Sequence, residues 1–195
     1  GDGQVMHDVL VTINDGKITA VTQGAGDDSQ SIAGAHMTPG LVDAYSYMGV
    51  DGATLEESRE STASLKLSNS LQFDAPAFGY ALSEGVTTAY ISPASRNVVG
   101  GLGCMVKTHG GQTASLFSEE GDAARLLDDS AALKVTLGGD PSQGNQTGSG
   151  KWTTSYTARR PNTRMGTVWV VRREFYRALE YVELRDDGQV AYNAD

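Results

Sequence analysis

Alternating apolar and polar residues open the chain between Asp8 and Ile13. The turn-forming run Asn14-Asp15-Gly16 follows, and a second short run with strand character covers residues 17–21. Alternation with a period of two, interrupted by an Asp-Gly turn, is typical of a β-hairpin. We therefore predict a hairpin here.

Short apolar runs separated by glycine and proline dominate the next part of the chain and predict strands alternating with helices. The predicted strands cover residues 41–47, 86–91, 104–107 and 133–137. A helix is predicted over residues 74–83, with Asp74 as its N-cap and Pro76 in its first turn. A weaker helical pattern covers residues 122–130. The glycine-rich run at residues 97–103 is predicted to be a loop.

The last strong signal is a helical one over about residues 163–184. Apolar residues recur there at helical spacing: Met165, Val168, Val171, Phe175, Leu179 and Val182. Such a stripe predicts a long amphipathic helix that packs against a partner surface. The polar, glycine-rich stretch at residues 138–157 precedes it, and its composition fits either a flexible loop over a site or a disordered excursion.

Composition narrows the classes of protein to consider. The 195 residues are 39% hydrophobic, which is enough to build a core, and the net charge of -9 argues against nucleic acid as a partner. No apolar run is long enough to span a membrane. Cys104 is the single cysteine, so an intrachain disulfide and a zinc–thiolate cluster are excluded, and a buried, inert thiol is expected.

The sequence leaves the cellular compartment open. The chain begins with Gly1-Asp2-Gly3 rather than methionine. Either a removed export signal or a truncated sequence would explain this start. A periplasmic or secreted bacterial location is therefore one alternative.

Several short stretches, in this order, carry a resemblance to a known family. They are the hairpin turn Asn14-Asp15-Gly16-Lys17-Ile18, the run Thr38-Pro39-Gly40-Leu41-Val42-Asp43, the run Gly85-Val86-Thr87-Thr88, the glycine-rich residues 97–103 ending in Lys107-Thr108, and residues 160–166. Together they resemble the amidohydrolase superfamily, in particular its imidazolonepropionase-like branch. The likeness spans nearly the whole chain.

The resemblance implies an α/β fold, namely a partial TIM-like (β/α) barrel preceded by a small β-sandwich segment. Residues 1–36 would form the sandwich segment, and residues 37–195 the first βα units of the barrel. A closed (β/α)₈ barrel usually takes about 250 residues. The resemblance therefore implies a second chain or a missing C-terminal portion that completes the barrel, and we predict an oligomer.

The chain departs from the family where the metal is bound. The resemblance places the family's His-x-His motif, which holds a divalent metal at the end of barrel strand one, at Tyr45 and Tyr47. A neutral phenol is a poor ligand for zinc compared with imidazole. The histidines of this chain are His7, His36 and His109, and of these only His109 is placed to reach the site. We predict no metal site in this chain, and a divalent metal such as zinc only if the missing portion supplies it.

Six residues are candidates for binding a ligand: Tyr45, Tyr47, Lys107, His109, Arg160 and Arg164. Each also has a plain structural interpretation. The tyrosines would fill the vacated metal site, Lys107 would form a surface salt bridge, and the arginines would tie a loop to the scaffold through carboxylates.

Two functions follow from the resemblance. The chain is the N-terminal portion of an amidohydrolase-like protein whose complete assembly hydrolyses C–N bonds of a cyclic amide or small peptide-like substrate. Alternatively, it is a non-catalytic binding or scaffolding subunit that has lost its metal site. Whether the assembly is an active enzyme stays open, and this chain alone is predicted to be inactive.

Overall fold

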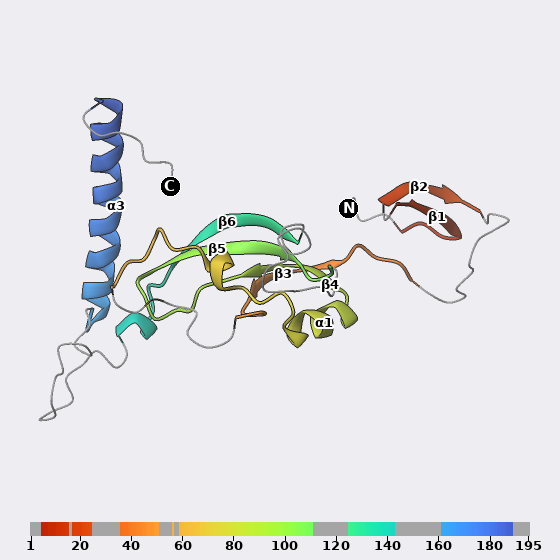
Figure 1. The fold of residues 1–195 in the computed structure, drawn as a ribbon, viewed down its shortest axis with the longest axis horizontal. Coiled ribbons are helices and arrows are strands. Elements are labelled where there is room, and N and C mark those ends of the chain that lie inside the picture. The colour runs from red at the N-terminus through yellow and green to blue at the C-terminus, as the bar shows by residue number, and fades with distance from the viewer. Residues whose placement is uncertain are drawn as a thin grey trace, which may run out of the picture. The chain divides into compact units, whose positions relative to one another are not determined.

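The computed structural model describes residues 5–15, 17–24, 36–50, 56, 59–110, 125–142 and 161–188. The chain divides into two compact units, Gly1–Pro39 and Gly40–Asp195. Each unit is described by itself (Figure 1).

The first unit contains the predicted hairpin. Strand β1 (Val9–Asn14) pairs antiparallel with β2 (Lys17–Gln23), and Asn14 lies opposite Lys17. The connection is therefore two residues long. Asp15 has a φ of 48°, which is the left-handed conformation that such a tight hairpin turn requires. The prediction from alternation and turn chemistry is confirmed.

The second unit is built on a four-stranded mixed sheet in the order β3-β4-β5-β6. The strands are β3 (Leu41–Ser46), β4 (Val86–Ile91), β5 (Val99–Lys107) and β6 (Leu126–Val135). β3 and β4 are parallel, whereas β5 is antiparallel to both of its neighbours. The chain is therefore mixed α/β, with one parallel strand pair at one side of the sheet.

The parallel pair is joined through the short helices η1 (Leu67–Ser70) and α1 (Pro76–Ser83), which makes a βαβ unit. Helix α1 confirms the prediction except at its start. Its N-cap is Ala75 and not Asp74, and no side chain caps it. Pro76 fixes the first turn, and Gly85, with a φ of +86°, takes the chain out of the helix.

Two sequence predictions in this sheet are wrong. Residues 126–130 belong to strand β6 and not to a helix, whereas residues 122–124 lie outside the described residues. Most of the glycine-rich run predicted as a loop is strand, because β5 begins at Val99. In both places pairing with neighbouring strands overrides a local signal.

The glycines of β5 are explained by what packs on them. Gly101 has a φ of +102°, and a Cβ there would lie 2.7 Å from the Leu65 carbonyl oxygen. At Gly103 a Cβ would collide with the phenol of Tyr90 and lie 2.6 Å from the Ile91 carbonyl oxygen. A strand with side chains at these positions would push its neighbours away.

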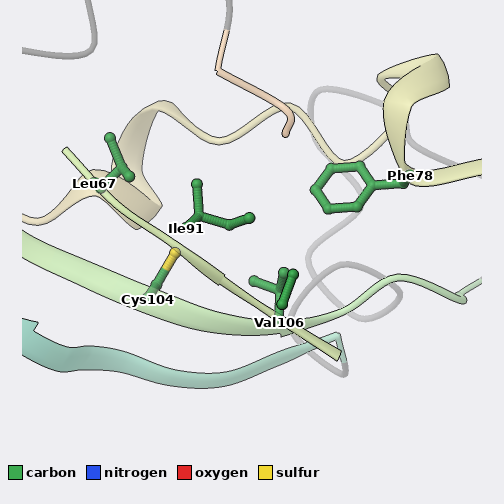
Figure 2. Close-up of a cluster of buried hydrophobic side chains, with 6 residues drawn as sticks. Leu67, Phe78, Ile91, Cys104 and Val106 are labelled. Carbon is green, nitrogen blue, oxygen red and sulfur yellow. The ribbon is translucent and has the colours of Figure 1, made fainter. Parts of the chain in front are cut away.

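The main core lies on the face of the sheet that α1 and η1 cover (Figures 1 and 2). Ile91, Cys104 and Val106 point from β4 and β5 toward Leu67 and Phe78 (Figure 2). The predicted burial of the cysteine is confirmed, since Cys104 has 0% exposure. Burial raises the pKa of this thiol to about 11, which keeps it protonated and unreactive at neutral pH.

The long predicted helix is confirmed as α3 (Arg164–Asp186). The Thr163 side chain accepts a hydrogen bond from the Gly166 N–H and caps the helix. The helix meets the rest of its unit through its first turns, where Val170 packs against Val98 and Val99.

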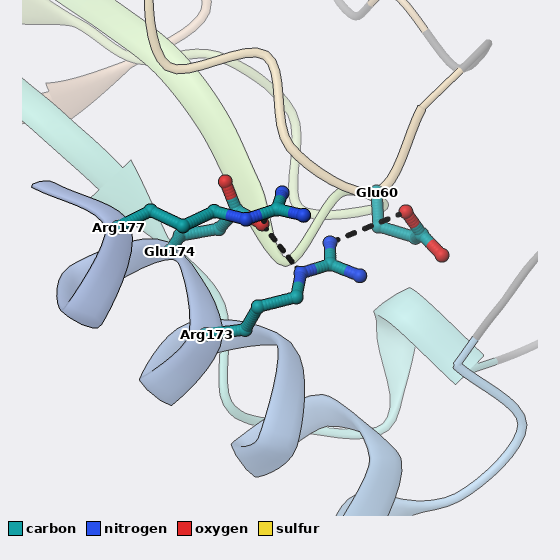
Figure 3. Close-up of polar contacts among 4 residues, drawn as sticks. All are labelled: Glu60, Arg173, Glu174 and Arg177. Atoms are coloured by element: carbon teal, nitrogen blue, oxygen red, sulfur yellow. Dashed lines mark hydrogen bonds and ion pairs between the residues drawn. The ribbon is translucent and has the colours of Figure 1, made fainter.

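An ion pair also holds α3. Arg173 extends from the helix between two carboxylates, 3.6 Å from Glu60 and 2.7 Å from Glu174 (Figure 3). Arg177 adds a further contact to Glu174 at 3.3 Å. The pair with Glu60 joins α3 to the segment between β3 and η1.

The apolar stripe of α3 is not the buried face. Met165 is 82% exposed, Phe175 55% and Leu179 58%, whereas Thr167 and Val170 are buried. Of the six stripe residues, Val171 is half-buried and packs against the cluster of Val98, Val99 and Val170, and the other five are exposed. The predicted loop at residues 138–157 is described only to residue 142, and it contains the short helix η2 (Asp140–Ser142). Among the described helices, none combines the length and apolar character needed to cross a membrane.

Candidate functional site

The candidate site lies at the carboxyl end of β3. Tyr45 is the second-last residue of the strand, and Tyr47 follows the strand directly. The Asp43 carboxylate accepts a hydrogen bond from the Tyr45 N–H at 3.0 Å, and the Ser46 hydroxyl accepts one from the Met48 N–H at 3.2 Å. These local bonds end the strand and hold both tyrosines in place.

The two tyrosines form a close pair. Their hydroxyl oxygens are 2.6 Å apart, and their rings meet edge to face with centroids separated by 5.4 Å. Tyr45 is 47% exposed and Tyr47 is 45% exposed. The structure therefore brings these two predicted residues together, and both are exposed.

Lys134 on β6 completes the cluster, which we call the tyrosine–lysine cluster (Tyr45, Tyr47 and Lys134). Its ammonium donates a hydrogen bond to the Tyr45 hydroxyl at 2.7 Å and lies 4.5 Å from the centroid of the same ring. The sequence alone did not identify this residue, because 89 positions separate it from Tyr45.

The contact crosses the sheet from its first strand to its fourth. Flat strands spaced by about 4.8 Å would put β3 and β6 about 14 Å apart, so two long side chains must reach over β4 and β5.

The contacts shift the pKa values of the two phenols in opposite directions. Partial burial raises the pKa of Tyr45, but hydrogen bonds from Lys134, Tyr47 and Ser95 outweigh it and lower that pKa to about 8. The hydrogen bond to Tyr45 and partial burial raise the pKa of Tyr47. Tyr45 is therefore the phenol that ionises first, and Tyr47 stays a neutral donor beside it.

The other predicted residues lie elsewhere. Lys107 is paired with Thr88 in the sheet and donates to its hydroxyl at 3.2 Å, and Thr108 bonds to Val86 and Thr87. This segment therefore lies at the start of β4, about three residues, or roughly 10 Å, from the strand end that carries the tyrosines. His109 follows it and is exposed.

Neither of the two predicted arginines is among the described contacts of the cluster. Arg164 is an exposed residue in the first turn of α3. Arg160 lies outside the described residues. Of the six predicted ligand-binding candidates, the structure brings Tyr45 and Tyr47 together and places Lys107 and His109 at the opposite end of the strand pair.

The residues of the cluster do not fit a divalent metal. Its three side chains offer two phenols and an ammonium, and the ammonium of Lys134, 2.7 Å from the Tyr45 hydroxyl, repels a second cation there. Within the residues that the structure describes, no three His, Cys, Asp or Glu side chains are grouped so that they could hold a metal ion.

Comparisons with known proteins give one informative likeness. Neither a protein-family model nor a curated protein sequence matches the chain. The crystal structure of an amidohydrolase from Thermotoga maritima MSB8 is similar to it, with 28% sequence identity and a TM-score of 0.71. The match covers 95% of this chain and 48% of that protein, so this chain spans about half the length of that amidohydrolase. The relationship to amidohydrolases that the sequence motifs indicate is supported.

Proposed function

We propose that this chain is the N-terminal portion of an amidohydrolase-like protein, of the imidazolonepropionase-like kind. The complete assembly would hydrolyse C–N bonds of a cyclic amide or small peptide-like substrate. The observation that carries this proposal is the match itself, which takes in nearly all of this chain and about half of the amidohydrolase. The reaction class rests on that likeness and not on a catalytic group of this chain.

The exposed apolar residues of β3 support the proposal that this chain is one part of a larger fold. Leu41 is 59% exposed and Val42 is 62% exposed, although both lie in a strand of the main sheet. Further barrel strands packed beside β3 would remove these side chains from water, at a gain of roughly 25 cal/mol per Å² of apolar surface. We propose that the parallel pair β3–β4, and not the antiparallel β5, is the first part of a TIM-like barrel that such strands complete.

The open stripe of α3 supports the same proposal. Its exposed members include Met165, Phe175 and Leu179, and it runs along a helix of 23 residues. A continuous apolar surface of this kind usually marks an interface. The remaining portion of the fold, as a C-terminal continuation or a second chain, is the occupant we propose, because about half of the amidohydrolase has no counterpart in this chain.

Native mass spectrometry of the protein isolated from its source tests this proposal. We expect a species, covalent or assembled, of about twice the 20.5 kDa of this chain, because the chain accounts for 48% of the matching amidohydrolase. A native polypeptide that ends near residue 195, with no partner bound, would contradict it. Denaturing mass spectrometry of the same sample separates a longer chain from a bound partner.

A second candidate function is favoured by the tyrosine–lysine cluster. It is a non-catalytic subunit that kept the fold and binds a ligand where related proteins hold a metal. The contact between the Lys134 ammonium and the Tyr45 hydroxyl carries this candidate, because a fixed positive charge disfavours a divalent cation at the same place. A measurement of metal binding by the chain separates the two candidate functions, because a metal bound at this site would contradict the non-catalytic subunit.

A further inference from the structure

We propose that the tyrosine–lysine cluster is a metal-independent proton-transfer site, in which the Lys134 ammonium is the resident cation and Tyr45 accepts a proton from a bound small molecule. These side chains do not fit a divalent metal, yet they are held in a defined geometry at an accessible strand end. The proposal stands whether the complete assembly is a hydrolase or a binding subunit, because it concerns the side chains of this chain alone.

Several donors converge on one oxygen. Lys134 Nζ lies 2.7 Å from Tyr45 Oη, and Tyr47 Oη lies 2.6 Å from it. Ser95 also interacts with this phenol through a side-chain hydrogen bond. An ammonium can only donate, so Tyr45 Oη is the acceptor in the bond from Lys134. Donors that converge on one oxygen stabilise its negative form.

The charges that face the cluster distinguish its phenols. Lys134 on β6 supplies the positive charge at Tyr45. On the other side, the Asp43 carboxylate is bound to the Tyr45 N–H, and Asp140 of η2 acts on Tyr47 and raises its pKa. On β4, burial raises the pKa of Tyr90. The phenolate is therefore favoured at Tyr45, and its two phenol neighbours stay protonated.

The two tyrosines are also accessible. Nearly half of each residue is exposed, so a small molecule can contact Tyr45 and Tyr47 without a change in the fold. Tyrosines that only filled space in a vacated site would be expected to lie buried. The exposed tyrosine, its neighbour Tyr47 and the fixed cation are the parts that a general base needs.

The proposed step balances without a metal or a redox partner. A ligand with a weakly acidic O–H or N–H gives its proton to the Tyr45 phenolate, so the ligand bond breaks and the phenol O–H forms. The ligand becomes an anion, and the Lys134 ammonium, released from the phenolate, stabilises it. The chemical class is a neutral small molecule that is acidic enough to ionise near pH 8.

Ultraviolet titration of tyrosine ionisation on the full chain is the first test. We expect a single phenol that ionises at about pH 8, well below the ordinary tyrosine value of about 10. Tyr45→Phe should remove this step, Lys134→Met should move it to higher pH, and Lys134→Arg, which keeps a cation, should retain it. Tyr80→Phe, on an exposed tyrosine of α1, should leave it unchanged.

Acetylation by N-acetylimidazole, followed by peptide mass spectrometry, is the second test. The phenolate oxygen of Tyr45 attacks the acetyl carbonyl, the O–C bond forms, the acetyl C–N bond breaks, and the departing imidazolide takes a proton from water. At about pH 7.5 we expect Tyr45 to react roughly tenfold faster than Tyr80, because the hydrogen bonds to Tyr45 favour its phenolate, although a less basic oxygen is a weaker nucleophile. Lys134→Met should remove most of that difference.

Two results would overturn the proposal. One is a titration in which no tyrosine of the folded chain ionises below about pH 9.5. The other is a rate of Tyr45 acetylation that equals that of Tyr80 or is unchanged in Lys134→Met. Circular dichroism of each variant shows whether it is folded. If a Lys134 variant does not fold, the titration of Tyr45→Phe, which removes only one hydroxyl, still decides the first test.

Discussion

Replacing Arg125 with methionine is expected to lower the free energy of unfolding by about 3 kcal/mol. Arg125 is 5% exposed, and its guanidinium donates to the carbonyl oxygens of Phe73 at 2.8 Å, Thr108 at 2.9 Å and Lys107 at 3.2 Å. The same group lies 4.9 Å from the ring centroids of both Phe73 and Phe78. Methionine fills much of the volume but leaves the three carbonyls without this donor.

The expected loss is large because Arg125 joins segments that are distant in the sequence. It ties the start of β6 to the end of β5 and to the loop before α1. Urea denaturation followed by circular dichroism measures the change. Arg177→Met is the matched control, because the Arg177 side chain is 64% exposed and a surface ion pair contributes about 0.5 kcal/mol. Equal losses in the two variants would contradict the role given to Arg125.

Replacing Gly101 with alanine should also cost about 3 kcal/mol. Its φ of +102° is strained for any L side chain, and the new Cβ would lie 2.7 Å from the Leu65 carbonyl oxygen, which is backbone and cannot swing away. Leu65 O also accepts a hydrogen bond from the Leu102 N–H at 2.8 Å, so a shift there disturbs the sheet.

A second glycine provides the control. Gly79 lies in α1, and a Cβ added there would meet no atom within 4 Å, so Gly79→Ala should stabilise the helix by about 0.5–1 kcal/mol. Denaturant midpoints of the two variants should therefore move in opposite directions from that of the parent chain. A Gly101→Ala chain as stable as the parent would show that the close approach at Leu65 is relieved at little cost.

The predictions that succeeded rest on local signals. The hairpin follows from alternation and an Asp-Gly turn, and α1 from Pro76 and Gly85 within one short segment. The period of the apolar residues located α3 almost to the residue. It did not identify the buried face, because burial depends on which surface meets Val98 and Val99, and a helical period carries no such information.

The predictions that failed depend on contacts between distant segments. Glycines in isolation favour a loop, yet Gly101 and Gly103 lie in a strand because Leu65 and Tyr90 pack on them. The start of β6 is a strand because β5 supplies its partner.

The candidate site shows the same division. The strand pattern and the resemblance located Tyr45 and Tyr47, which are two residues apart. Lys134 is brought to them by the pairing of the strands in the sheet, which has no local signature. β5 runs antiparallel to β4, so Lys107 lies beside the start of β4, away from the tyrosines. The order of the residues in the sequence does not show this.

One physical claim is central, namely that the strand end bearing Tyr45 and Tyr47 holds a lysine ammonium and no divalent metal. Equilibrium dialysis of the purified chain against zinc, followed by elemental analysis, measures this directly. The Tyr45→Phe, Tyr47→Phe double variant is the comparison. We expect the parent and the variant to retain equal amounts of zinc, because the tyrosines bind none. One equivalent of tightly held zinc in the parent, lost in the variant, would contradict the claim.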